Sequence, residues 1–159
     1  MQSLQDWLPI LYLLSHHPMS QKFLTGWLGY IVITFALGAV WHLILFRDIY
    51  DSLGVYANLD HPNFVLGILS MVIQGWLLSW LFPRFYRGQH PLKEALTFSW
   101  LMGLFFGSGS VIAEVAKQHV SSLALWFLLA GGFTFIHFTL IGLLFGFMYR
   151  NERNPRAAS

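Results

Sequence analysis

The chain has 159 residues, of which 56% are hydrophobic, 18% aromatic and only 10% charged, and its mean hydropathy is +0.58. A soluble domain carries roughly 25% charged residues, and a domain of this size buries too little of its chain to hide so much apolar surface. The composition therefore predicts an integral membrane protein. The sequence has no cysteine, which excludes thiol chemistry, and a net charge of +2 is too small to suggest a nucleic-acid partner.

Residues 1–22 come before the first long apolar stretch. Within them Leu4, Trp7, Leu8 and Leu11 repeat at helical spacing, but the segment is too short to span a bilayer. We expect an amphipathic helix lying on the membrane interface, with a frayed terminus as the alternative.

Four apolar stretches reach the roughly 20 residues that a membrane-spanning helix needs. They lie at about 24–46, 64–82, 95–115 and 123–148. The sequence therefore predicts an all-α bundle of four transmembrane helices over residues 23–150, followed by a basic tail at 151–159.

Lysine and arginine are distributed unevenly between the two sides of this bundle. Seven of the nine lie beside the first span's start, in the second loop or in the tail: Lys22, Arg84, Arg87, Lys93, Arg150, Arg153 and Arg156. Only Arg47 and Lys117 lie on the other side. Because positive residues concentrate on the cytoplasmic side, we expect both termini in the cytoplasm.

Several aromatic residues fall near the predicted ends of the spans and are expected to form interfacial belts. These residues are Trp27, Tyr30, Trp80, Phe85, Tyr86, Trp126 and Tyr149.

Small residues predict where the third and fourth spans pack. In the third span Gly103 and Gly107 share a face with Glu114, and small residues let membrane helices approach closely. In the fourth span Gly142 and Gly146 lie roughly opposite His137. If His137 points into the bundle, the glycine pair is free to pack on a second copy or on another membrane protein.

Polar residues form stripes on the first and second spans. Thr34 and His42 lie on one face of the first span, and Gln74 lies on the inward face of the second. Counting residues from the span ends at ~1.5 Å each places His42 and Glu114 about 5–7 Å below the outer surface. Polar groups are costly against lipid, so we expect them to face inward.

These positions suggest an outward-facing pocket with His42 and Glu114 at its mouth, Gln74, Thr34 and His137 deeper, and Trp41 beside it. Such a pocket would bind or pass a small solute, ion or lipid. In the competing interpretation Glu114 pairs with Lys117, and His42 only reaches the interface or bonds a neighbouring helix. A second functional hypothesis is an accessory or scaffold subunit that docks another membrane protein through its glycine-rich faces.

Metal and cofactor sites have weaker support. A haem would need His42 and His137 at similar heights, yet they differ by ~15 Å along the helix axes. A zinc or copper site could use His42, His61, His119 and Glu114, but their spacing matches no known motif. No catalytic motif is visible, so we predict no catalytic residues, bound metal or cofactor, and the bilayer as the main partner.

The stretches "GAVWHLILF" and "DIYDSLGV" resemble a family of short four-span bacterial membrane proteins known as a domain of unknown function. The residues that carry the resemblance are Gly38, Trp41, Leu45, Phe46 and Tyr50, while His42 stands where that pattern more often has an aromatic. The resemblance covers mainly the first span. It implies a bundle in the bacterial inner membrane and no specific activity.

Overall fold

The computed structural model describes residues 21–54 and 63–151, and these two ranges contain helices and loops without any strand. The helix expected within residues 1–22 and the tail beyond Asn151 lie outside the described residues, apart from the start of the first span. The elements, with η marking a π-helix, are α2 (Gln21–Gly38), η2 (Ala39–Leu45), α3 (Arg47–Leu53), α4 (Phe64–Phe85), α5 (Pro91–Gly107), η3 (Ser108–Ala113), α6 (Leu123–Trp126), η4 (Phe127–Gly131) and α7 (Gly132–Tyr149).

Four helices are long and apolar enough to cross a membrane: Gln21–Leu45, Phe64–Phe85, Pro91–Ala113 and Leu123–Tyr149. Within the described residues this confirms the prediction of an all-α protein with four helices able to span a membrane. The third helix begins at Pro91 rather than near residue 95, because proline is well tolerated in the first turn of a helix. The second helix continues through Pro83 to Phe85.

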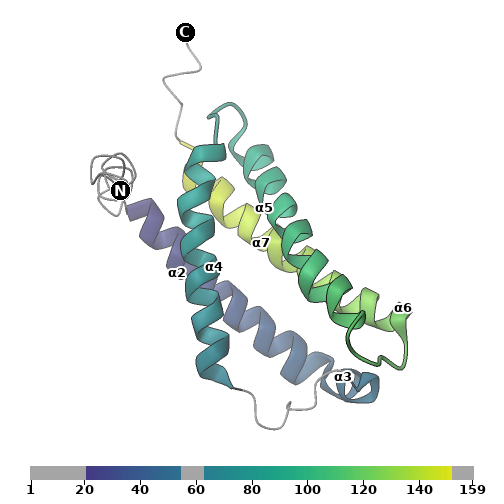
Figure 1. Ribbon diagram of the computed structural model, residues 1–159. Coiled ribbons are helices and arrows are strands. Elements are labelled where there is room, and N and C mark those ends of the chain that lie inside the picture. The colour runs from purple at the N-terminus through teal and green to yellow at the C-terminus, as the bar shows by residue number, and fades with distance from the viewer. Residues whose placement is uncertain (1–20, 55–62, 152–159) are drawn as a thin grey trace, which may run out of the picture.

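Helix α7 is the central element of the bundle. It packs along α5 on one side and against α2 on another, while α4 packs mainly on α2. Figure 1 shows α5 and α7 side by side and α4 crossing α2. We call the end of the bundle that carries the α4–α5 loop the loop end, and the end that carries α3 and α6 the α3 end.

Gly142 and Gly146 set the approach of α5 to α7. A Cβ on Gly142 would lie 3.0 Å from Leu96 Cα, and one on Gly146 would lie 3.1 Å from Leu92 Cα. His137 is also buried, with 3% of its surface exposed. The expectation that a buried His137 leaves this glycine pair free for another subunit is wrong, because the central position of α7 covers both faces within one chain.

The small residues of the third span make the reciprocal contact. A Cβ on Gly103 would lie 2.8 Å from Phe138 Cγ, and one on Gly107 would lie 3.4 Å from Thr134 Cγ2. This face of α5 therefore lies against α7, as the spacing predicts, and the close approach increases van der Waals contact where lipid offers no hydrophobic driving force.

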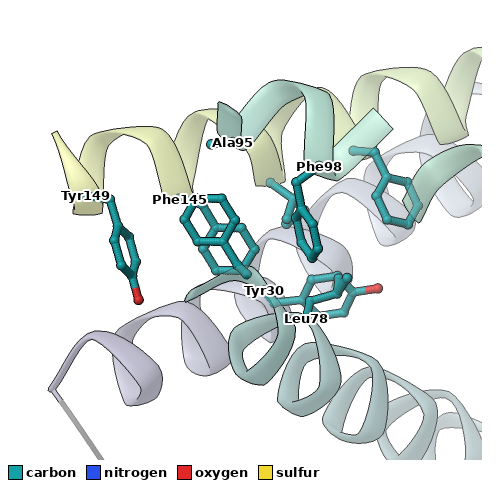
Figure 2. Close-up of a cluster of buried hydrophobic side chains, with 9 residues drawn as sticks. Tyr30, Leu78, Ala95, Phe98, Phe145 and Tyr149 are labelled. Atoms are coloured by element: carbon teal, nitrogen blue, oxygen red, sulfur yellow. The ribbon is translucent and has the colours of Figure 1, made fainter. Parts of the chain in front are cut away.

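Aromatic side chains fill the core at the loop end. Figure 2 shows this cluster, in which Tyr30, Leu78, Ala95, Phe98, Phe145 and Tyr149 are labelled. Phe82 stacks on Phe145 with 4.9 Å between ring centroids. Tyr30, Trp126 and Tyr149 are 0%, 1% and 7% exposed. These three residues pack inside the protein, so their expected place in an interfacial belt is wrong.

Helix α3 forms within a segment that the sequence indicates only as a loop. Its Tyr50 and Leu53 are buried against the α3 end of the bundle, and Gly54 ends the helix with a φ of 72°. Ser121 ties α3 to the third loop, because its backbone N–H donates to the Leu53 carbonyl at 3.3 Å and its hydroxyl to the Ser52 carbonyl at 3.1 Å. The charged residues of α3 lie on its exposed side. They lower the mean hydropathy of the segment, so hydropathy alone does not indicate that Tyr50 and Leu53 are buried.

The α4–α5 loop is organised by one carboxylate. Glu94, in the first turn of α5, accepts hydrogen bonds from the backbone N–H groups of Arg87 (2.5 Å), Gly88 (3.3 Å), Gln89 (2.9 Å) and His90 (2.9 Å). A carboxylate is favourable at the N-terminus of a helix, where unpaired N–H groups gather.

Candidate functional site

A cavity of about 370 Å³ lies in the α3 half of the bundle, between α2, η2 and α4. Its polar lining residues are Thr34, His42, Ser70 and Gln74. The larger apolar residues of its wall are Phe35, Leu43, Phe64, Ile68, Met71, Phe106 and Phe133. Three residues of the predicted pocket therefore line one cavity: Thr34, His42 and Gln74.

Two hydrogen bonds hold the polar groups behind this cavity. The Tyr30 hydroxyl donates to Gln74 Oε1 at 2.6 Å, and Thr34 Oγ1 lies 2.8 Å from His137 Nε2. The Tyr30 and His137 rings meet edge to face, with 5.4 Å between their centroids. The four residues join α2, α4 and α7, and they satisfy one another in a region where unpaired polar groups are costly. His137 thus supports the cavity from behind and is not part of its lining.

His42 lies within η2, at the α3 end of the cavity. Its Nδ1 is 3.1 Å from the Gly38 carbonyl oxygen. Its ring stacks on Tyr50 with centroids 4.9 Å apart and meets Phe133 edge to face at 4.7 Å. Turns of π-helix often occur at functional sites, and η3 and η4 place two more of them in the same half of the bundle.

Trp41 belongs to the packing around α3 and not to the cavity wall. Its indole N–H donates to the Tyr50 hydroxyl at 3.3 Å, and its ring packs on Phe46 with 4.6 Å between centroids. Burial raises the pKa of the Tyr50 hydroxyl above its usual range, so this group stays neutral at ordinary pH. Trp41 therefore helps to fix the α3 helix beside His42.

Glu114 lies away from the cavity, at the end of the third helix. Its Oε2 is 3.5 Å from Lys117 Nζ, and its Oε1 accepts a hydrogen bond from Gln118 Nε2. Glu114 is not among the residues that line the cavity with His42. The i→i+5 winding of η3 turns the residues beyond it away from the face that regular α-helical spacing predicts. The structure therefore matches the competing interpretation, in which Glu114 pairs with Lys117.

A second groove of about 520 Å³ lies between α5–η3 and η4–α7. It is lined by Trp100, Gly103, Leu104, Gly107, Ser108, Val111, Ile112, Phe127, Gly131, Thr134, Phe135 and Phe138. The hydroxyls of Ser108 and Thr134 donate to backbone carbonyls of their own helices at 2.7 and 2.8 Å. This groove therefore offers shape and apolar surface but little polar chemistry.

Metal ligands do not gather in the part of the chain that the structure describes. No group of three or more His, Asp or Glu side chains lies close enough to hold an ion within residues 21–54 and 63–151. His61, a member of the zinc or copper alternative, lies outside the described residues. His137, a member of the haem alternative, has its Nε2 beside Thr34. Within the described residues, the polar groups of the cavity therefore offer hydrogen bonds and not a set of metal ligands.

Tyr30 is the one residue of this site to which the sequence argument gave a different role. It lies four residues before Thr34, on the same helical face that continues through Gly38 to His42. That spacing could have indicated the role of Tyr30 in the site, because a tyrosine on a polar inward face can bring its hydroxyl to a hydrogen-bond partner.

Comparisons of the chain with protein-family models, with curated proteins and with solved structures give no match.

Proposed function

We propose that this is a small integral membrane protein that binds a small amphipathic molecule in the cavity lined by Thr34, His42 and Gln74. The observation that carries the proposal is that four polar side chains from two spans, those of Thr34, His42, Ser70 and Gln74, line one mostly apolar cavity. Binding sites for small molecules combine a mostly apolar wall with a few polar groups. Polar residues inside a membrane are costly and are commonly retained for function.

The geometry favours binding over passage through the bilayer. Toward the loop end the cavity meets the bond between Tyr30 and Gln74. Beyond that bond lies the aromatic cluster around Phe82 and Phe145. A path for a polar solute would have to cross this packed core, so a site that opens in one half of the membrane is the simpler function.

Glycine packing gives less support to the alternative of a scaffold subunit. Gly103, Gly142 and Gly146 each face a neighbouring helix of the same chain at 3.1 Å or closer. Surfaces already used inside the bundle are not available to a partner protein.

We also propose that both termini face the cytoplasm of a bacterial inner membrane, with the segment before Gln21 lying on the inner surface. The distribution of lysine and arginine supports this orientation, and the resemblance of the first span supports the bacterial assignment. In this orientation the cavity opens in the outer half of the bilayer.

Thermal unfolding of the purified protein tests the binding function. The panel consists of phospholipids and a ten-carbon alcohol, ketone, fatty acid and amine. A ligand that binds only the native state raises its stability by RT ln(1 + [L]/Kd). We expect at least one compound to raise the Tm of the wild type and of the control Glu114→Gln, whose side chain lies outside the cavity.

The blocking variant is Gly67→Leu. Gly67 lines the cavity, and no atom lies within 4 Å of a Cβ built on it, so the new side chain would occupy the space without disturbing the polar residues. We expect Gly67→Leu to abolish the shift in Tm. A shift that survives in Gly67→Leu, or a wild type that responds to no compound, would reject the proposed function.

A further inference from the structure

The hydrogen-bonding direction of the cavity is set by the amide of Gln74. A glutamine amide offers one oxygen acceptor and two N–H donors. The Tyr30 hydroxyl already donates to Oε1 at 2.6 Å. The Nε2 atom makes no hydrogen bond to the described residues, and it is not among the buried polar atoms that lack a partner. It is therefore accessible as a donor in a residue that lines the cavity.

The other polar groups of the wall are already engaged within the protein. The Ser70 hydroxyl donates to the Gly67 carbonyl at 2.8 Å, and the Thr34 hydroxyl lies 2.8 Å from His137 Nε2. His42 Nδ1 donates to the Gly38 carbonyl oxygen at 3.1 Å. Gln74 Nε2 is thus the donor that the described wall can offer to a ligand without breaking a bond.

The described wall carries no permanently charged side chain. None of its residues is Asp, Glu, Lys or Arg. Moving a charged group from water into an apolar site without a partner of opposite charge is very costly. An occupant therefore carries no net charge, and most of its surface is apolar.

We propose that the cavity binds an uncharged amphiphile whose polar end is a carbonyl group, as in a ketone, an ester or a quinone, with the carbonyl oxygen accepting a hydrogen bond from Gln74 Nε2. This inference rests on the proposed function and names its ligand class. Tyr30 acts as a positioning residue, because its bond to Oε1 keeps the N–H side of the amide turned toward the ligand. A site built to donate a hydrogen bond discriminates against a molecule that lacks the acceptor.

Four probes of equal chain length separate the possibilities: 2-decanone, decane, decanoate and decylamine. Their binding to the full-length protein is measured from the shift in Tm against mole fraction in the detergent micelle. We expect 2-decanone to bind ~5–10-fold more tightly than decane, the gain of one buried hydrogen bond. We expect both charged probes to bind more weakly than the ketone.

Three variants test the role of each group. Gln74→Leu should bind decane as the wild type does and lose the preference for the ketone. Tyr30→Phe keeps the ring and releases the amide, so the preference should fall several-fold while decane binding stays. Ser70→Ala is the matched control, because its hydroxyl bonds its own helix, and its ketone preference should remain.

The outcomes distinguish this inference from the function on which it rests. If decane or a charged probe binds as tightly as the ketone, and Gly67→Leu abolishes that binding, the ligand class is wrong and the binding function stands. If Gly67→Leu leaves every shift unchanged, both are rejected. If Tyr30→Phe lowers the affinity for decane and ketone equally, Tyr30 has only a structural role.

Discussion

At Gly142 the backbone of α5 leaves no room for a side chain on α7. A Cβ there would lie 3.0 Å from Leu96 Cα and 3.3 Å from the Ala95 carbonyl oxygen. Because a backbone cannot move aside as a flexible side chain can, Gly142→Ala should destabilise the protein by ~1–3 kcal/mol. The loss is measured as a lower Tm or as easier unfolding in a denaturing detergent.

Gly131→Ala is the matched control for that substitution. Gly131 lies in the same long helix, Leu123–Tyr149, and no atom lies within 4 Å of a Cβ built on it. Alanine is the better helix former by about 1 kcal/mol, so this variant should be neutral or slightly more stable. Equal losses in Gly142→Ala and Gly131→Ala would contradict the close approach of α5 to α7.

The polar residues of the site were predictable to the extent that they followed regular helical spacing. Thr34 and Gln74 lie on α-helical faces, and His42 comes only four residues after Gly38, the last residue of α2. The cost of polar groups in lipid turned these faces inward. Glu114 lies beyond η3, where the winding changes and the face cannot be extrapolated. The place of Tyr30 in the site could not be predicted without knowing its partner, because an aromatic ring near the end of a span suits the membrane interface and the protein core equally well.

The α4–α5 loop is the element whose structure depends most on one side chain. Four backbone N–H groups, from Arg87 to His90, donate to the carboxylate of Glu94. Glu94→Ala removes all four acceptor contacts, and bonds to a charged acceptor are worth ~1.5–3 kcal/mol each at most. We expect the loop to open, so that trypsin cleaves after Arg87 several-fold faster, as followed by mass spectrometry.

Two further variants calibrate that experiment. Glu94→Gln keeps one acceptor oxygen and should give an intermediate rate of cleavage. Gln89→Ala changes an exposed side chain in the same loop but leaves its backbone N–H in place, so its rate should match the wild type. If Glu94→Ala is cleaved no faster than Gln89→Ala, the carboxylate does not hold the loop.

Among the elements, the four spans followed from length and hydropathy, whereas α3 and the π-helical turns did not. A span is specified by its own composition, since every backbone group must be satisfied within the helix. Helix α3 is specified by what its buried Tyr50 and Leu53 contact on other segments. The turns η2, η3 and η4 are changes of winding within apolar stretches. Hydropathy does not distinguish a π-helical turn from an α-helical one.

For the whole molecule, the proposed orientation has consequences for the cavity. The cavity lies in the α3 half of the bundle, so it opens in the outer leaflet only if the loop end faces the cytoplasm. The absence of cysteine makes single-cysteine labelling free of background. His119→Cys and Ser52→Cys report on the α3 end, and Gln89→Cys and Asn151→Cys report on the loop end, since all four positions are exposed.

We expect a membrane-impermeant maleimide added to intact spheroplasts to label the cysteines introduced at positions 52 and 119. Those at positions 89 and 151 should react only after the membrane is opened, because the basic residues near the loop end favour the cytoplasmic side. The reversed pattern would place both termini outside and the cavity in the inner leaflet. A ligand would then reach His42 from the cytoplasmic leaflet, while the contacts of Gln74 and Tyr30 would stay the same. The labelling pattern therefore decides from which leaflet the site is supplied, independently of what the site binds.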